Sequence, residues 1–143
     1  MSIMHIGLAE LERDFERISI IPDDTVSKML NASTTILADE TKQTAETMLN
    51  GPYYKGAIKK SIYVSKMQKK KGYRSMYVKF RGKVKDEKHP KGESVARIAY
   101  INEYGKHNQP ARPFIREATY QGTDAAVTAA AEVYDEFLKK HNM

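Results

Sequence analysis

The stretch YINEYGKHNQPARPFIREA, from Tyr100 to Ala118, joins the end of a strand-like segment to the start of a helix. Between them lies a turn rich in Gly and Pro, which punctuate regular structure. The candidate structural residues of this motif are Glu103, Tyr104, Gly105, Arg112, Pro113 and Phe114. Nothing in it has the spacing of a metal site, a nucleotide-binding loop or a nucleophile with its base. These residues are therefore predicted to hold a shape and a partner surface.

The segments on either side of this turn are predicted from their apolar pattern. Val95–Ile101 is expected to be a strand that passes into a helical turn near Tyr104. After Pro113, which suits the first position of a helix, the chain is predicted to be helical to its end, with a bend at Gly122. The apolar stripe of this last helix consists of Phe114, Ile115, Ala118, Ala125, Ala129, Val133 and Phe137.

The N-terminal part of the chain is predicted to form two helices. Apolar residues recur at helical spacing from Met4 to Ile18, with charged residues between them. A second helix is expected to begin at Asp23 or Asp24, whose carboxylate can cap its first turn. Residues 50–52, Asn-Gly-Pro, should end this helix with Gly as its C-cap.

The middle of the chain changes to the alternating period of strands. Ile58–Ser65 and Tyr73–Arg81 are predicted to be antiparallel strands with one solvated face. Between them, residues 66–72 form a basic turn, and residues 82–94 are expected to be a long mobile loop.

These elements together predict an α+β fold in one domain covering residues 1–143. Two N-terminal helices precede a small antiparallel sheet of three to four strands, and a long C-terminal helix packs on one face of the sheet. A chain of this length can build a core without disulfides, and it contains no cysteine.

The composition also bears on location. The N-terminus lacks the basic start and apolar block of a signal peptide, and no run approaches the roughly 20 apolar residues that span a bilayer. The protein is therefore predicted to be soluble, not secreted and without a membrane partner.

The net charge of +6 is distributed unevenly along the chain. Residues 51–91 hold fourteen Lys and Arg against two Asp and Glu, whereas residues 1–50 hold four against nine. Residues 92–143 are near neutral, with six against seven. Such a basic block can attract nucleic acid or an acidic protein face.

Six lysines of this block are the candidate contacts to DNA or to an acidic partner. They are Lys66, Lys69, Lys70, Lys71, Lys83 and Lys85. Tyrosines interleaved with them supply rings that could stack on bases. The alternative is that Tyr and Lys form the solvated face of a half-buried sheet, with Lys blocking unwanted strand pairing.

Catalytic and metal-binding readings find little support in the sequence. The four histidines lie far apart, and none has a second histidine or a carboxylate at a ligand-like spacing, so no metal or cofactor is expected. Glu103 could act as a general base, but such a base needs a positioned substrate and usually a partner acid. Arg112 and Arg116 are expected instead to brace the turn by pairing with Glu103 or Glu117.

Three pieces of the chain, in register, carry a resemblance to a known family. They are residues 7–11 (GLAEL), residues 56–62 (GAIKKSI) and the Tyr100–Gly105 segment followed by residues 111–115 (ARPFI). With them, the chain resembles the small tail-completion, neck or head-tail joining proteins of long-tailed double-stranded DNA bacteriophages and prophages. The family usually has Thr-Gly before its sheet entry, where this chain has Lys55-Gly56.

What the resemblance implies is a non-enzymatic virion part made in the bacterial host cytoplasm. It would assemble as a ring, a hexamer, at the joint between head and tail, with a long helix packed against a curved sheet. Its neighbours would be head-connector and tail-tube or tail-terminator proteins, with the DNA backbone passing through the channel.

Two alternatives from other functional classes remain open at the level of sequence. One is a small nonspecific DNA-binding or DNA-packaging accessory protein, whose segment from Lys55 to Lys91 would grip the phosphate backbone. The other is a small basic nuclease, which would need further metal ligands and an activated water that are not evident in the sequence.

Overall fold

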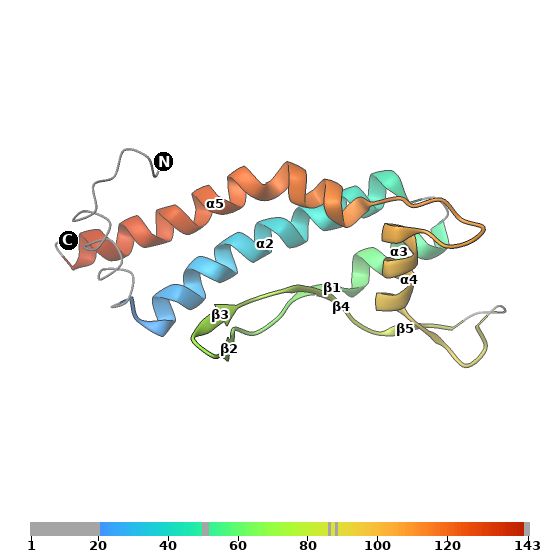
Figure 1. The fold of residues 1–143 in the computed structure, drawn as a ribbon, viewed down its shortest axis with the longest axis horizontal. Coiled ribbons are helices and arrows are strands. Elements are labelled where there is room, and N and C mark those ends of the chain that lie inside the picture. The colour runs from blue at the N-terminus through green and yellow to red at the C-terminus, as the bar shows by residue number, and fades with distance from the viewer. Residues whose placement is uncertain (1–20, 50–51, 86, 88, 142–143) are drawn as a thin grey trace.

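The computed structural model describes residues 21–49, 52–85, 87 and 89–141 (Figure 1). Its elements are α2 (Asp23–Met48), α3 (Pro52–Ser61), β1 (Ile62–Val64), β2 (Gln68–Lys70), β3 (Tyr73–Ser75), β4 (Val78–Phe80), β5 (Lys83–Val84), β6 (Glu93–Ser94), α4 (Val95–Tyr104) and α5 (Phe114–Lys140). The predicted α+β class is confirmed. The predicted helix from Met4 to Ile18 lies outside the described residues.

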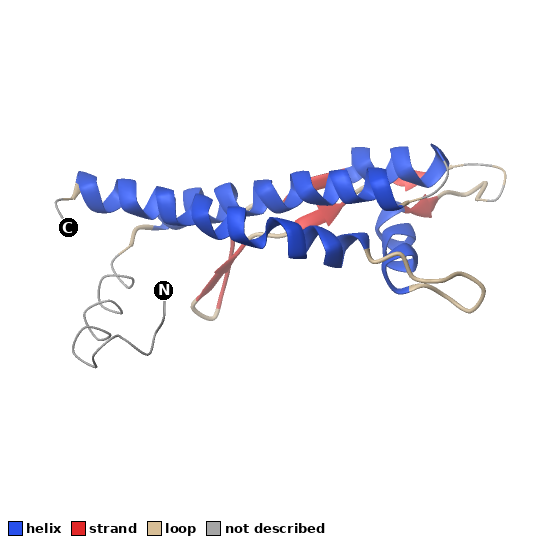
Figure 2. Cartoon of the chain, turned by 90° about the horizontal axis from the view of Figure 1, so that it is seen from above, coloured by secondary structure: helices blue, strands red, loops and turns tan. Residues whose placement is uncertain are grey.

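The two long helices, α2 and α5, lie side by side along the length of the molecule (Figures 1 and 2). Gly122 and Ala126 on α5 are buried, and the hydroxyl of Ser33 on α2 donates to the carbonyl of Ala126 at 2.8 Å. A Cβ atom at Gly122 would stand 3.0 Å from Cγ of Glu40, so glycine permits the close approach of the two helices. The two predicted long helices are present, but the buried face of α5 includes Gly122 and Ala126, whereas Ala125 of the predicted stripe is exposed.

The start of α2 differs in detail from the prediction. Pro22 precedes the helix, and no side chain caps its N-terminus. Asp24 accepts a hydrogen bond from the N–H of Thr25 instead, at 2.9 Å. The carboxylates of Asp23 and Asp24 still place negative charge in the first turn, where the helix dipole favours it. The other end of α2 passes into extended backbone at Leu49, and the predicted glycine C-cap, Gly51, is not among the described residues.

The strands form three antiparallel pairs and not the single sheet that was predicted. The pairs are β1 with β4, β2 with β3, and β5 with β6. The β1–β4 pair packs under α2, so α2 lies between it and α5 (Figure 1). The C-terminal helix thus rests on a helix and not on a sheet, which corrects the predicted packing.

Two segments predicted as strands are helical over much of their length. The predicted strand Ile58–Ser65 is helix α3 as far as Ser61, and only Ile62–Val64 is extended. The predicted strand Val95–Ile101 lies within helix α4. In α4 the residues Val95, Ile98, Ala99 and Asn102 are buried, a spacing that suits a helix packed on a core. Tertiary burial has therefore overridden the strand preference of the β-branched residues.

The segment 82–94, predicted as a long loop, is closed at its base. Lys83 pairs with Ser94, and Val84 pairs with Glu93. The N–H of Val95 then donates to the carbonyl of Gly82 at 3.1 Å. These bonds fix where the loop leaves the molecule and where α4 begins.

The core lies at the end of the molecule where α3, α4 and the first turn of α5 meet α2 and the β1–β4 pair. Its buried apolar residues are Ala38, Ala45, Leu49, Ile58, Ile62, Val95, Ile98, Ala99 and Phe114. Phe114 and Ile58 are the largest side chains that are fully buried. The turn between α4 and α5 is therefore anchored in the best-packed part of the protein.

Candidate functional site

Helix α4 ends at Gly105, the glycine of the quoted motif. Gly105 has φ 78° and ψ 177°, a backbone conformation that residues other than glycine hardly adopt. Its N–H donates to the carbonyl of Ile101 at 2.7 Å. A Cβ atom at this position would come within 2.8 Å of the backbone nitrogen of Ala111. Glycine is thus required both for the reversal of the chain and for its close return.

The loop after Gly105 is folded back on the end of α4. Lys106 and Gln109 exchange backbone hydrogen bonds of 2.9 and 3.0 Å across a tight turn. The N–H of Arg112 donates to the carbonyl of Asn102 at 2.6 Å, and the side chain of Gln109 donates to that of Asn102 at 3.3 Å. Asn102 is buried and donates in turn to the carbonyl of Ile98. One buried amide therefore ties the loop to the helix.

Glu103 joins this loop to helix α5. Its two carboxylate oxygens accept hydrogen bonds from the N–H groups of Ile115, at 2.7 Å, and Arg116, at 3.1 Å. A carboxylate in this place satisfies donors that the first turn of a helix leaves unpaired, and its charge suits the positive end of the helix dipole. The side chain is buried, with 8% of its surface exposed.

The predicted pairing of Glu103 with an arginine is wrong. Among the described residues, no ion pair joins Arg112 or Arg116 to Glu103. The backbone amides at the start of α5 are the partners instead, because the loop brings them directly onto the carboxylate. Pro113 stands just before α5 and not at its first position.

Phe114 fastens the start of α5 to the rest of the molecule. Its ring is fully buried and meets the ring of Phe80 on β4 edge to face, with centroids 6.1 Å apart. Its carbonyl accepts a hydrogen bond of 2.7 Å from the hydroxyl of Thr44 on α2. The structure therefore brings Glu103, Gly105 and Phe114 together in one joint between two helices, where a strand had been expected before the turn.

The tyrosines of the motif are exposed, in contrast to the buried residues of the joint. Tyr100 and Tyr104 are 63% and 68% exposed, and their rings lie 4.7 Å apart on the outer face of α4. Tyr120, in α5, is 81% exposed. Tyr100 and Tyr104 are one helical turn apart and therefore lie on the same face of α4. The sequence predicts this pairing only if Val95–Tyr104 is taken as a helix. We call Tyr100 and Tyr104 the tyrosine pair.

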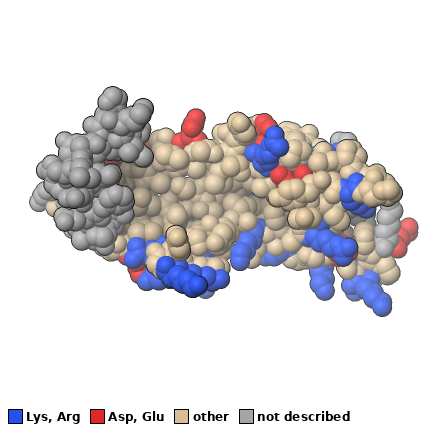
Figure 3. Space-filling model, in the orientation of Figure 1, with Lys and Arg blue, Asp and Glu red and all other residues tan. Residues whose placement is uncertain are grey.

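The six predicted lysines fall into two groups at different places in the strand layer. Lys66, Lys69, Lys70 and Lys71 belong to the β2–β3 hairpin and the segment leading into it, whereas Lys83 and Lys85 belong to β5 and the residue after it. All six are exposed. Figure 3 shows Lys and Arg side chains along the lower edge of the molecule, over the strand pairs.

The β2–β3 hairpin is tied to α2 by charge. Lys69 and Arg74 face each other across the hairpin, and both form ion pairs with Asp23. Lys71 and Gly72 form its turn with φ of 47° and 84°, as a two-residue hairpin turn of this hand requires. Lys69 is therefore bound to its own chain, which weakens its case as a contact to a partner.

Sequence reasoning missed a second set of cations on β4. Lys79 and Arg81 are exposed, and each lies over a tyrosine ring. Nζ of Lys79 is 5.8 Å from the ring centre of Tyr77, and the guanidinium carbon of Arg81 is 4.8 Å from that of Tyr63. The alternation Tyr77, Lys79, Arg81 was visible in the sequence, but the diagonal contact to Tyr63 depends on the strand register.

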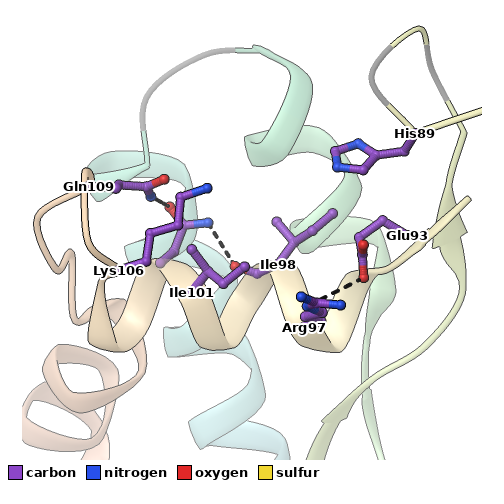
Figure 4. A pocket seen from close by; sticks show the side chains of 8 residues that line it. His89, Glu93, Arg97, Ile98, Ile101, Lys106 and Gln109 are labelled. Carbon is purple, nitrogen blue, oxygen red and sulfur yellow. Dashed lines mark hydrogen bonds and ion pairs between the residues drawn. The ribbon is translucent and has the colours of Figure 1, made fainter.

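A small pocket of about 180 Å³ lies between the β5–β6 hairpin, α4 and the turn at 106–109 (Figure 4). Ile98 and Ile101 lie between charged groups, with His89 and Glu93 on one side and Lys106 on the other. Nε of Arg97 is 3.8 Å from a carboxylate oxygen of Glu93. The lining residues include no hydroxyl or thiol group.

The histidines are dispersed, and His5 lies outside the described residues. His107 is exposed in the turn after α4, and Nδ1 of His141 is 2.9 Å from the carbonyl of Phe137. In the part of the chain that the structure describes, no three His, Asp or Glu side chains are grouped so that they could hold a metal ion. Of the helices in those residues, none is long and apolar enough to cross a membrane.

Comparison of this chain with protein-family models, with curated proteins and with solved structures gave no match. Its function is therefore argued from the geometry described above.

Proposed function

We propose that this chain is a structural subunit of a tailed bacteriophage or prophage particle. It works without catalysis at the junction of head and tail, where copies of the chain assemble as a ring between the head connector and the tail tube. The resemblance of the three sequence pieces supports the family, and the way the third piece is used in the structure supports a structural role.

The buried and the exposed residues of the motif from Tyr100 to Ala118 differ in a way that supports this structural role. Its polar residues Asn102 and Glu103 are buried and hydrogen bonded to backbone within the joint. Both oxygens of Glu103 are occupied, so the residue is badly placed to take a proton from a substrate. What the motif offers to the outside is the tyrosine pair.

The exposed tyrosine pair is the observation that carries the proposal. Tyrosine is enriched at protein interfaces because its large ring buries apolar area while its hydroxyl stays hydrogen bonded. Here two such rings lie together on a helix that the core and the joint hold rigidly. A preformed apolar patch of this kind suits contact with a neighbouring protein, at a low cost in ordering.

Closure into a ring needs a head-to-tail contact between two unlike surfaces of the same chain. The molecule is long and its surfaces differ, with the paired helices along one side and the strand pairs along the other (Figure 1). The tyrosine pair lies on α4, near one end of α5, so it is available to meet a different surface of the next copy.

The proposal is tested by replacing the tyrosine pair in the full chain, as Tyr100→Ser with Tyr104→Ser. Native mass spectrometry and electron microscopy of the purified chain, alone and in assembling particles, should find closed rings of one copy number for the unaltered protein. The double variant should keep its melting temperature and lose the rings. Tyr73→Ser, at a tyrosine on the β2–β3 hairpin that is 77% exposed, is the control and should assemble normally.

Two outcomes would contradict the proposal. The double variant could assemble as well as the unaltered chain, which would remove the tyrosine pair from the interface. The unaltered chain could also stay monomeric both alone and in assembling particles, which would contradict the proposal that it is a structural ring subunit.

A further inference from the structure

The outer side of the β4 segment carries a continuous row of cations. The exposed residues alternate along the chain, while the residues between them face the core or turn the backbone. We call this row, with the two tyrosines beside it, the basic strand face: Tyr63, Tyr77, Lys79, Arg81, Lys83 and Lys85.

The pairing of β1 with β4 explains why Tyr63, Tyr77, Lys79 and Arg81 share a face, and Lys83 and Lys85 follow on β5 and the residue after it. Tyr63 stands opposite Lys79 in the register, and Ile62 stands opposite Phe80. Hydrogen bonds from Arg81 N–H to Ser61 and from Ser65 N–H to Tyr77 extend the ladder at both ends. Because side chains alternate across a strand, Tyr77, Lys79 and Arg81 lie on the side away from α2.

Within the described residues, the cations of this face form no ion pair with a carboxylate. Elsewhere in the described structure, Lys59 pairs with Glu46 at 2.9 Å, Arg97 with Glu93, and Lys69 and Arg74 with Asp23. No ion pair within the described residues involves Lys79, Arg81, Lys83 or Lys85. This positive charge is therefore not paired within the part of the chain that the structure describes.

The two tyrosine rings hold two of these cations in place. The guanidinium of Arg81 lies over Tyr63, and the ammonium of Lys79 lies over Tyr77, at distances typical of cation–π contacts. Each cation occupies one face of its ring, and that face is not available for stacking on unpaired bases. The ring of Tyr63 contacts the guanidinium of Arg81 through a ring face and forms no hydrogen bond to it. The N–H groups of Arg81 therefore remain available to donate to an anion.

A protein partner fits this face less well than DNA does. Protein interfaces are depleted in lysine and depend on buried aromatic or apolar anchors. Here each aromatic ring already has a cation over one face, and the remaining groups are exposed lysines. A row of like charges matches instead the regularly spaced phosphates of a double helix.

We propose that the basic strand face binds the phosphate backbone of double-stranded DNA without reading its sequence. Phosphate contacts position a protein on DNA and carry no sequence information, so no base preference follows. The proposal does not rest on ring assembly, and it goes beyond the structural role by giving the subunit a DNA contact of its own.

Fluorescence anisotropy with a labelled 30-base-pair duplex of mixed sequence tests the proposal on the full chain. The affinity should fall with salt, and four phosphate contacts predict a log-log slope of about −3.6. Lys79→Gln with Arg81→Gln should weaken binding at least about tenfold at 0.1 M salt and reduce the slope by about 2. The corresponding single strand should bind no more tightly than the duplex.

The matched control is Lys139→Gln with Lys140→Gln, which makes the same change of net charge at the far end of α5. It should leave the slope within about half a unit of that of the unaltered chain. Equal losses in the two variants would mean that only net charge matters and would overturn the proposal. Circular dichroism confirms that each variant remains folded.

Two further results would also overturn the proposal. The unaltered chain could fail to bind duplex DNA and bind an acidic peptide through Lys79 and Arg81, which would make the face a protein contact. It could also bind single strands much more tightly, which would indicate base stacking. The Tyr100→Ser, Tyr104→Ser variant separates the two proposals, since it should lose rings and keep DNA binding.

Discussion

Glu103 shows how one side chain can determine the geometry of a joint between two helices. It belongs to the end of α4 and caps the start of α5, twelve residues further along the chain. The cap by Glu103, together with Gly105 and Phe114, fixes both ends of the loop between the two helices and so restricts its conformation. A carboxylate with both oxygens bound to backbone amides has a structural role.

Glu103→Ala is predicted to destabilise the protein by about 1–3 kcal/mol, because it leaves two amides at the start of α5 without acceptors. Glu103→Gln should cost less, since its carbonyl oxygen can still accept one of the two bonds. Denaturant unfolding followed by circular dichroism measures both free energies.

The control for this pair is Glu132→Ala, at an exposed position on α5. It should change the free energy of unfolding by no more than about 0.5 kcal/mol. If Glu103→Ala were as mild as the control, the carboxylate would not be supporting the joint, and a role for Glu103 in binding or chemistry would have to be reconsidered.

The β2–β3 hairpin is the element whose position depends most clearly on charge. Asp23, in the first turn of α2, binds both Lys69 and Arg74, which stand opposite each other in the hairpin. These groups are partly exposed, so the pairs contribute little to global stability. Their effect should be local.

Asp23→Ala is therefore predicted to leave the free energy of unfolding within about 1 kcal/mol of the unaltered value while loosening the hairpin. Amide hydrogen exchange should become faster in residues 68–75 and stay unchanged in α5. Asp24→Ala removes the same charge from the same helical turn without breaking an ion pair, and it should leave exchange in the hairpin as it was. Equal exchange in the two variants would refute the tether.

The elements differ in how far their sequence predicts them. Both long helices were predicted because their apolar residues repeat at helical spacing over many turns. Val95–Ile101 was predicted to be a strand because Val, Ile and Tyr favour strands, but the segment lies in helix α4, with Val95, Ile98 and Asn102 buried. Short segments depend more on what they pack against than on their own preferences.

The candidate site was predictable only where its residues act locally. Gly105 and Pro113 of the motif indicate a turn from the sequence alone, and the structure has a turn between α4 and α5. The cap by Glu103 on α5 and the pairing of Lys69 with Asp23 join residues 12 and 46 positions apart. Such contacts depend on the tertiary fold, and no local pattern in the sequence predicts them.

At the scale of the whole molecule, charge divides along the two layers. α2 holds five Asp and Glu against two Lys, and α5 holds five against three Lys and Arg. The strand layer carries the excess positive charge (Figure 3). This division gives the subunit two unlike sides, and the tyrosine pair on α4 adds a third kind of surface.

The central claim is that this chain joins head and tail, and electron microscopy of particles made without it tests that claim most directly. If the proposal holds, deleting the gene from the phage or prophage genome that would carry it should leave DNA-filled heads and separate tails. A plasmid copy of the unaltered gene should restore joined particles, and the Tyr100→Ser, Tyr104→Ser copy should not. Joined, infectious particles at normal yield without the gene would contradict the account.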